Sequence, residues 1–455
     1  MHRGIARSAD MTQGVIWKEM LIFFLPIMLG TFFQQLYNTA DAMVVGRFVG
    51  KEALAAVGGS AASLINLLVG FFVGLSSGAT VIISQYHGAR DEDAVGRALH
   101  SAMALSLAGG LFLLVVGVVF APEMLRMMKT PEEIMPDSVA YMRIYFLGII
   151  PNLIYNMGSG VLRAVGDSRR PLFFLIVCCV LNIALDLLFV VTFGMGVRGV
   201  AWATILSMAV SALLVMLTLR GAGHGCRLSI RRIRFYRGIT GRMMRIGLPG
   251  GFQSVLYAVS NMLIQANING FGTDAVAAWT TFGKVDGILW MILSAFGLAV
   301  TTFVGANFGA RKPDRMRQSV KTAYGLSMGI TLVISVLVTV FGRALYGLFT
   351  GDETVIALGQ RMMRAITPYY FTYVSIEILS GALRGMGDVY KPTLLTCGGI
   401  CGLRVLWILG IVPLFPSVEM VAYSYPITWA ITSILFILYY RKRMRHIALP
   451  EPAVV

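Results

Sequence analysis

The segment that decides the fold reads Ser159-Gly160-Val161-Leu162-Arg163-Ala164-Val165-Gly166-Asp167 and is followed by Pro171. It returns 221 residues later as Ser380-Gly381-Ala382-Leu383-Arg384-Gly385-Met386-Gly387-Asp388, followed by Pro392. Other matches share this register within two residues: Gly88-Ala89-Arg90 with Gly309-Ala310-Arg311, Leu25-Pro26 with Leu248-Pro249, and Asn38 with Asn261. Matches at one offset indicate an internal duplication. The Gly-Asp motif, with a proline soon after it, is typical of a helix end and a turn into the next helix.

The composition places both copies in a membrane. Hydrophobic residues make up 57% of the 455 residues, charged residues only 13%, and the mean hydropathy is +0.75. A crossing helix needs about 20 mostly apolar residues, and each half offers six such stretches. Since six is even, both halves enter the membrane from one side and form a parallel repeat. We therefore predict an all-α integral membrane protein with twelve transmembrane helices in two six-helix bundles related by a pseudo-twofold axis.

The charge distribution predicts the topology. A net charge of +16 could indicate nucleic-acid binding in a soluble chain, but 27 of the 38 basic residues fall in the tails and loops of one side and 8 in the opposite loops. Basic loops are characteristic of the cytoplasmic side, so nucleic acid is not needed as a partner. The interpretation is a multi-pass protein of the cell membrane with both termini in the cytoplasm. Its predicted parts are tail 1–16, N-lobe 17–220, basic linker 221–242, C-lobe 243–440 and tail 441–455.

Ionisable side chains within the crossings are the candidates for function, because burying them in lipid is costly. Gln34, Asn38 and Asp41 follow helical spacing along the first crossing, Asn182 and Asp186 share a face of the fifth, and Thr204 lies in the sixth. Two carboxylates, an amide and a hydroxyl form an all-oxygen set suited to a hard cation such as Na⁺. A close pair of carboxylates could equally carry a transported proton. The structural alternative is a set of polar groups that pair helices.

The second half does not repeat this acidic set. In its first crossing, uncharged polar side chains recur every four residues, at Gln253, Tyr257, Asn261 and Gln265. Ile264 occupies the position that corresponds to Asp41 of the first half. Four ionisable residues lie elsewhere in this half: Lys284, Asp286, Glu377 and Arg404. Lys284 either shapes a substrate cleft or pairs structurally with an acid. The halves are therefore expected to share a scaffold and differ in chemistry.

From about Ile16 to Arg441 the chain resembles the multidrug and toxic compound extrusion (MATE) family. The resemblance rests on Pro26, the segment Gln34-Gln35-Leu36-Tyr37-Asn38-Thr39-Ala40-Asp41, both Gly-Ala-Arg loops and both Leu-Arg-x-x-Gly-Asp motifs. In the most similar, DinF-like branch, the resemblance implies a cation site at Asp41, Asn182, Asp186 and Thr204, and a helix hinge at Pro26. The NorM-like branch has a Glu where this chain has Tyr257, so a cation site of that type is not expected here.

The resemblance implies a secondary antiporter that exports organic cations, drugs or other lipophilic compounds against Na⁺ or H⁺ by alternating access. No cofactor is expected besides the coupling ion, no metal besides Na⁺, and no partner besides small-molecule substrates and the bilayer; the monomer would be functional. The predicted substrate cleft includes Gln34, Tyr37, Asn38, Tyr257, Asn261 and Lys284. A flippase for lipid-linked precursors from the same superfamily and a metabolite exporter are the alternatives. An enzyme is not expected, since the sequence carries no nucleophile or metal motif.

Overall fold

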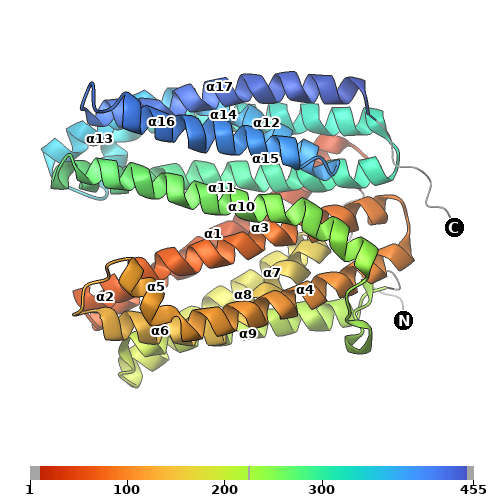
Figure 1. Cartoon of the computed structure of the whole chain (residues 1–455), viewed down its shortest axis with the longest axis horizontal. Coiled ribbons are helices and arrows are strands. Elements are labelled where there is room, and N and C mark those ends of the chain that lie inside the picture. Colours follow the sequence, from red (N-terminus) through yellow and green to blue (C-terminus); the bar gives the residue numbers. More distant parts are fainter. Residues whose placement is uncertain (1–10, 224–225, 448–455) are drawn as a thin grey trace. The chain divides into compact units, whose positions relative to one another are not determined.

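The computed structural model describes residues 11–223 and 226–447, and every regular element in these ranges is a helix (Figure 1). The chain divides into two compact units. Among the described residues, one unit comprises 21–251 and the other comprises 11–20 together with 252–447. The ends of the two predicted tails and residues 224–225 of the predicted linker lie outside the described residues.

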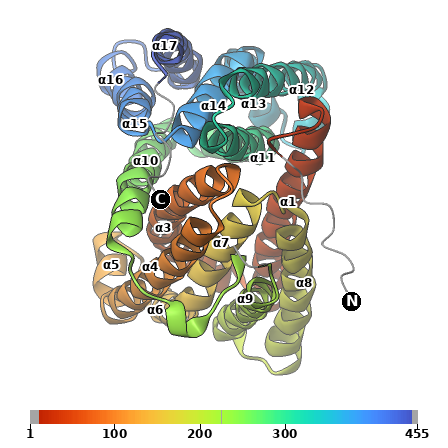
Figure 2. The ribbon, with the colours of Figure 1, turned by 90° about the vertical axis from the view of Figure 1, so that its right-hand side faces the viewer.

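The first unit is built from the helices that precede the middle of the chain. In order they are α1 (Ile16–Phe48), α2 (Lys51–Gly58), α3 (Ser60–Gly88), α4 (Glu92–Val119), α5 (Ala121–Met127), α6 (Met135–Leu147), α7 (Ile149–Ala164), α8 (Arg169–Asp186), the π-helical η1 (Leu187–Thr192), α9 (Gly196–Arg220) and the 3-10 turn η3 (Ile230–Arg232). α9 packs against α6, α7 and α8, and α3 packs against α4 and α7 (Figure 2). The apolar core of this unit includes the fully buried Val45, Leu113, Phe146 and Val200.

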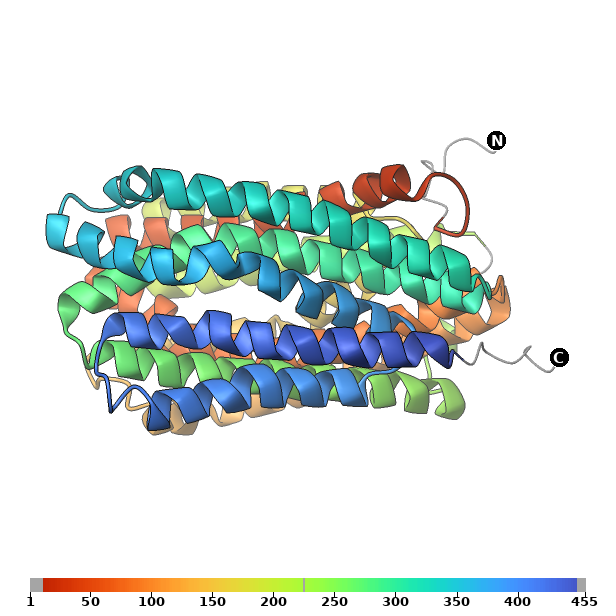
Figure 3. The same ribbon diagram turned by 90° about the horizontal axis from the view of Figure 1, so that it is seen from above.

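The second unit contains the remaining helices. These are α10 (Arg237–Asn269), α11 (Thr273–Gly309), α12 (Pro313–Gly347), α13 (Glu353–Ile366), the 3-10 turn η4 (Thr367–Tyr369), α14 (Tyr370–Gly385), α15 (Tyr390–Thr396), the π-helical η5 (Cys397–Gly402), α16 (Leu403–Gly410) and α17 (Val418–Arg445). The long helices of this unit run alongside one another (Figure 3), with α14 packed against α11, α12 and α17.

Short breaks explain why there are more helices than membrane crossings. Nine helical segments of the described chain are long and apolar enough to cross a bilayer, and α6 with α7 forms a tenth that is bent by 50°. The pair α13–α14, broken at η4, and the less apolar α10 complete the twelve. The predicted fold class, an all-α membrane protein of twelve helices in two bundles, is confirmed.

The repeated motifs end helices in the same way in both halves. Gly166 and Gly387 adopt φ values of 91° and 82°, in the left-handed region that glycine tolerates best. In each case the backbone N–H of the following Asp bonds to a carbonyl five residues earlier: Asp167 to Leu162 at 2.9 Å, Asp388 to Leu383 at 3.0 Å. This is the Schellman arrangement of a helix C-terminus. The duplication in sequence is thus a duplication of helix ends.

Close packing within the units is duplicated as well. The Thr80 hydroxyl lies 2.7 Å from where a Cβ on Gly160 would be, and Thr301 lies 3.1 Å from the same position on Gly381. Thr301 and Gly381 follow Thr80 and Gly160, respectively, by the repeat offset of 221 residues. The Thr301 hydroxyl also lies 3.1 Å from the Gly381 carbonyl, across α11 and α14. Small residues at these contacts let two helix backbones approach closely, as membrane helices often do.

Two helices carry the chain from one unit to the other, and each contains a proline. α1 passes from the second unit to the first after Met20 and holds Pro26; α10 passes in the opposite direction after Gly251 and holds Pro249. A proline inside a helix removes a backbone hydrogen bond and permits a bend. The predicted lobes begin at residues 17 and 243, whereas residues 11–20 pack with the second unit and the start of α10 packs with the first.

The segment before α1 is held by side chains of the second unit. The Asn307 amide donates to the Met11 carbonyl at 2.9 Å, Lys312 donates to the Thr12 carbonyl at 2.8 Å, and Arg315 donates to the carbonyls of Met11, Gln13 and Gly14. Met11 itself is buried. These bonds explain why residues 11–20 belong to the second unit even though α1 continues in the first.

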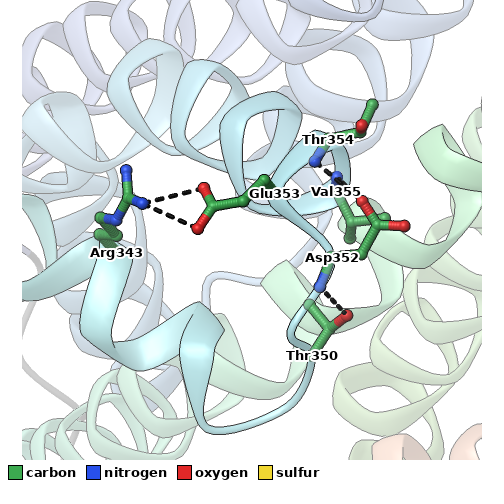
Figure 4. Close-up of polar contacts among 6 residues, drawn as sticks. All are labelled: Arg343, Thr350, Asp352, Glu353, Thr354 and Val355. Atoms are coloured by element: carbon green, nitrogen blue, oxygen red, sulfur yellow. Dashed lines mark hydrogen bonds and ion pairs between the residues drawn. The ribbon is translucent and has the colours of Figure 1, made fainter.

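The connection between α12 and α13 shows how a short turn is fixed (Figure 4). The Asp352 carboxylate caps α13 by accepting the backbone N–H groups of Thr354 and Val355, and Arg343 holds Glu353 through both carboxylate oxygens at 2.8 and 2.9 Å. An Asp at the N-cap and a Glu in the first turn also suit the positive end of the helix dipole.

Candidate functional site

The four residues predicted to form a cation site come from three helices of the first unit and are all buried. Asp41 lies on α1, Asn182 and Asp186 lie on α8, and Thr204 lies on α9, with exposed fractions between 0 and 6%. The Thr204 hydroxyl is 3.3 Å from an oxygen of Asp41, across 163 residues of sequence, and 2.9 Å from the Val200 carbonyl of its own helix. Asp186 and Asn182 lie within interaction range of Asp41. The structure therefore brings the predicted set together.

Most polar atoms of this cluster have no hydrogen-bond partner among the described residues. One oxygen of Asp41, both oxygens of Asp186, and both the oxygen and the nitrogen of the Asn182 amide are buried and unpaired. Buried polar atoms are nearly always paired, and a buried carboxylate without a compensating charge is costly. Unpaired oxygens from two carboxylates and an amide, beside a hydroxyl, are a donor set that fits a hard cation or a proton.

The backbone widens immediately after Asp186. The regular α8 ends at this residue and the π-helical η1 begins at Leu187. π-helical turns are rare and are frequently found at functional sites.

Three tyrosines surround the acidic cluster, and two of them are absent from the sequence-based site. Tyr37, Tyr141 and Tyr145 are each less than 10% exposed and lie within electrostatic range of Asp41. Tyr37, which the sequence places in the substrate cleft, is buried beside this cluster, and its part in a cleft stays a prediction. Tyr141 and Tyr145 share a face of α6, at a spacing of four, and the Asn152 amide lies 3.4 Å from the Tyr145 hydroxyl. The spacing is visible in the sequence, but the approach of α6 to α1 is not.

The other residues of the predicted cleft are accessible within their own units. Gln34 and Asn38 of α1 are exposed, as are Asn261 of α10 and Lys284 of α11. Lys284 forms no ion pair among the described residues, neither with Asp286, which lies two positions away in the chain, nor with another acid. Whether these residues share a cleft remains a prediction, and so does the hinge at Pro26.

The second unit contains a polar cluster walled by aromatic rings. Asp286 accepts hydrogen bonds from the Tyr370 hydroxyl at 2.6 Å and from the Trp290 indole at 2.5 Å. Trp429 is fully buried at the centre, with ring centroids of Trp290, Tyr370, Tyr373 and Tyr425 between 5.4 and 6.2 Å away. The Asp286 carboxylate is thus fixed by two aromatic donors rather than by Lys284.

Arg404 is the cation of this cluster. Its side chain is 3% exposed, its guanidinium carbon lies 3.9 Å from the centre of the Tyr425 ring, and its Nε has no hydrogen-bond partner among the described residues. At the repeat offset of 221, Tyr425 corresponds to Thr204, and Arg404 lies one residue after the counterpart of Asn182. In the sequence repeat, the buried positive charge of the second unit therefore lies next to the counterpart of Asn182.

Glu377 lies beside this cluster on α14. The Tyr373 hydroxyl is 3.4 Å from one of its oxygens and 3.4 Å from the hydroxyl of Tyr257 on α10. Its carboxylate occupies the space that a side chain on Gly297 would need. The sequence singled out Tyr257 and Glu377 separately, and the structure joins them through Tyr373. No group of three or more His, Cys, Asp or Glu side chains gathers at a metal-binding distance in the described ranges.

Comparison with known proteins agrees with this architecture. The sequence model of the MatE family matches residues 26–188 and 249–409, one stretch in each half. The chain is 28% identical over 435 residues to the probable multidrug resistance protein YoeA of Bacillus subtilis, covering 94% of each chain. It is 25% identical over 393 residues to the probable multidrug resistance protein NorM of Geobacillus kaustophilus, covering 82% of this chain and 83% of that one.

The fold is found among solved structures too. A structure described as the outward-facing conformation of a multidrug resistance MATE family transporter superposes with a TM-score of 0.88 at 23% identity, covering 97% of this chain and 99% of that one. A MOP superfamily transporter from Pyrococcus furiosus gives 0.89 at 24% identity with the same coverage. The duplicated helix ends, the twelve-helix architecture and the match to both halves together mean that the chain belongs to the MATE family of multi-pass membrane transporters.

Proposed function

We propose that the protein is a cation-coupled antiporter of the cell membrane that exports organic, lipophilic compounds. The observation that carries the proposal is the buried cluster of Asp41, Asn182, Asp186 and Thr204, with its unpaired oxygens. In lipid, such a cluster is stable only when a positive charge or protons compensate it. The names of the relatives, multidrug resistance proteins, support drug-like compounds as the substrates.

Coupling would arise because the cluster joins three helices. A cation bound by Asp41 and Asp186 draws α1 toward α8 and α9, and thereby favours one conformation of α1 over another. Since α1 contains Pro26 and passes from one unit to the other, a change in the conformation of α1 would change the arrangement of the predicted lobes. Ion and substrate then influence each other's binding through this shared equilibrium. The coupling ion is Na⁺ or H⁺.

The decisive experiment measures efflux in proteoliposomes with each ion gradient imposed separately. Asp41→Asn and Asp186→Asn keep the shape of the side chain and remove its charge, so each should lower gradient-driven efflux of a fluorescent organic cation at least about tenfold, or 1.4 kcal/mol. Asp314→Asn is the matched control, because the Asp314 side chain is 86% exposed and lies outside the cluster.

Two results would count against the proposal. If Asp41→Asn retains full efflux under the same gradient, the acidic cluster is structural. If the wild-type protein moves labelled lipid in a headgroup-dependent manner and no organic cation, the protein is a flippase. Thermal unfolding of each variant shows whether a loss of efflux is merely a loss of folding.

A further inference from the structure

The helices α15 and α17 lie on one edge of the second unit (Figure 2). Between them is a groove with apolar walls and two lysines at one end. Its volume is about 420 Å³, within the range of ligand sites in proteins. It is lined by Lys391, Leu394, Leu395, Leu435, Leu438, Tyr439 and Lys442. None of these residues belongs to the acidic cluster or to the aromatic cluster described above.

Each helix contributes one lysine and two leucines on the same face. Leu394 and Leu395 come three and four residues after Lys391 in α15, while Leu438 and Leu435 come four and seven residues before Lys442 in α17. Such spacings align side chains along one side of a helix. Lys391 is the second residue of α15, Lys442 lies in the last turn of α17, and Lys391 approaches the Tyr439 ring of α17, so both lysines lie at the same end of the groove. The leucines extend about 10 Å from that end along the helices.

The lysines carry uncompensated positive charge. Neither Lys391 nor Lys442 forms an ion pair with any described residue, and Lys391 lies 5.5 Å from the centre of the Tyr439 ring. The neighbouring acid, Asp388, is already engaged, because it accepts a 2.5 Å hydrogen bond from the Tyr439 hydroxyl and lies 3.4 Å from Arg443. Among the described residues, a ligand therefore meets two lysines without an ion-pair partner at the mouth of the groove, and the one neighbouring carboxylate is already paired.

We propose that this groove binds one anionic glycerophospholipid, with its phosphate at Lys391 and Lys442 and an acyl chain along the leucines. Basic pockets between transmembrane helices, at the side of the basic loops, are suited to anionic headgroups. Leu394 and Leu438 are 71% and 58% exposed, as expected where hydrocarbon is the solvent. A second copy of the chain fits less well, since a twofold contact would bring the lysines of both copies together.

This site goes beyond the proposed transport function and does not depend on it. The lipid is retained at the edge of the second unit, where it fastens α15 to the end of α17; it is not cargo. Binding is therefore measured on the purified full-length protein without any ion gradient, and its outcome is separable from that of the efflux experiment.

The test compares phosphatidylglycerol with phosphatidylcholine of identical acyl chains, by native mass spectrometry and by thermal unfolding. The wild-type protein should retain phosphatidylglycerol in preference and gain thermal stability from it. Lys391→Gln combined with Lys442→Gln should weaken phosphatidylglycerol binding on the order of tenfold. Lys18→Gln with Lys321→Gln is the matched control; it removes two exposed lysines outside the groove and should bind as the wild type does.

A second pair of variants tests the apolar wall. Leu394→Gln with Leu438→Gln leaves the charge unchanged and should weaken phosphatidylglycerol binding as well, whereas glycerol phosphate and inorganic phosphate should not stabilise any variant. Equal retention of phosphatidylglycerol by the Lys391→Gln/Lys442→Gln protein would overturn the proposal. So would equal retention of both lipids by the wild type, or stabilisation by inorganic phosphate as large as that by the lipid, which would indicate a site for a free anion.

Discussion

At the scale of single residues, the two units bury opposite charges: the first unit buries carboxylates, and the second buries a guanidinium next to the position that corresponds to Asn182 in the sequence repeat. The first unit buries Asp41 and Asp186, whose carboxylates keep oxygens without a hydrogen-bond partner among the described residues, and the second buries Arg404 against the Tyr425 ring. A buried guanidinium is stabilised by a ring face and by an acid within electrostatic range, here Asp286. Removing one member of such a set leaves the other uncompensated, which costs more than removing both.

Because removing either Asp286 or Arg404 leaves the other charge uncompensated, we predict an energetic coupling between these two residues that a double-mutant cycle can measure. Asp286→Asn and Arg404→Gln should each lower the Tm, and the double variant should lower it by less than the sum of the two. A coupling of about 0.5–3 kcal/mol is usual for residues of one network. In a unit of about 200 residues each kcal/mol corresponds to roughly 2–4 °C of Tm. Additive shifts in lipid nanodiscs would show that Arg404 is stabilised by Tyr425 alone.

At the scale of elements, glycines determine where the start of α10 packs. A Cβ on Gly78 of α3 would lie 2.2 Å from the Met243 carbonyl oxygen, and a Cβ on Gly247 of α10 would lie 2.2 Å from the Leu75 carbonyl oxygen. Both obstacles are backbone atoms, which cannot rotate away. The contact between α3 and the first turns of α10 therefore requires glycine on both helices, and it accounts for the place of residues 237–251 in the first unit.

Gly78→Ala and Gly247→Ala should therefore each destabilise the protein, by about 1–3 kcal/mol, as overpacking does elsewhere. Gly325→Ala in α12 is the matched control, since no atom lies within 4 Å of a Cβ at that position. The control should leave the protein unchanged or slightly more stable, because Ala favours helix over Gly. Thermal unfolding followed by intrinsic fluorescence measures all three. A Gly78→Ala protein as stable as the control would mean that the two helices can separate freely.

At the scale of the whole molecule, the duplication and the basic loops predict which side each loop faces. The cytoplasmic placement of both termini is a proposal that rests on the positive-inside pattern. Asp314 lies in the first turn of α12, in a basic loop that is predicted to face the cytoplasm. Glu132 lies in the connection between α5 and α6, which is predicted to face the opposite side. Both residues are exposed.

Labelling with a membrane-impermeant maleimide checks this orientation. In a background without the five native cysteines, Glu132→Cys should react in intact cells, and Asp314→Cys should react only after the membrane is permeabilised. Cys226 is the native thiol in the connection after α9, and burial raises its pKa to about 11, so its replacement should remove little reactivity. Labelling of Asp314→Cys in intact cells, with Glu132→Cys protected, would reverse the proposed topology.

The sequence by itself determined the local and periodic features of this protein. Six apolar crossings per half, the repeat offset of 221 residues and the helix ends at Gly166 and Gly387 depend on composition and backbone preference, which short stretches of chain carry on their own. The acids were found for the same reason: a charge within an apolar crossing is visible without knowledge of its neighbours. Asp41, Asn182, Asp186 and Thr204 can be grouped from the sequence because their side chains form one all-oxygen set, and the resemblance to the MATE family implies the same group.

The tertiary structure decided which faces meet. In the packed structure, Tyr141 and Tyr145 lie beside Asp41. Tyr373 connects Tyr257 to Glu377, and the start of α10 packs with the first unit. Helical spacing fixes which residues share a face, but the rotation of one helix against another depends on side-chain packing over the whole bundle. The acidic cluster could therefore be predicted as a set of residues, while its tyrosine surroundings and its unpaired oxygens required the packed structure.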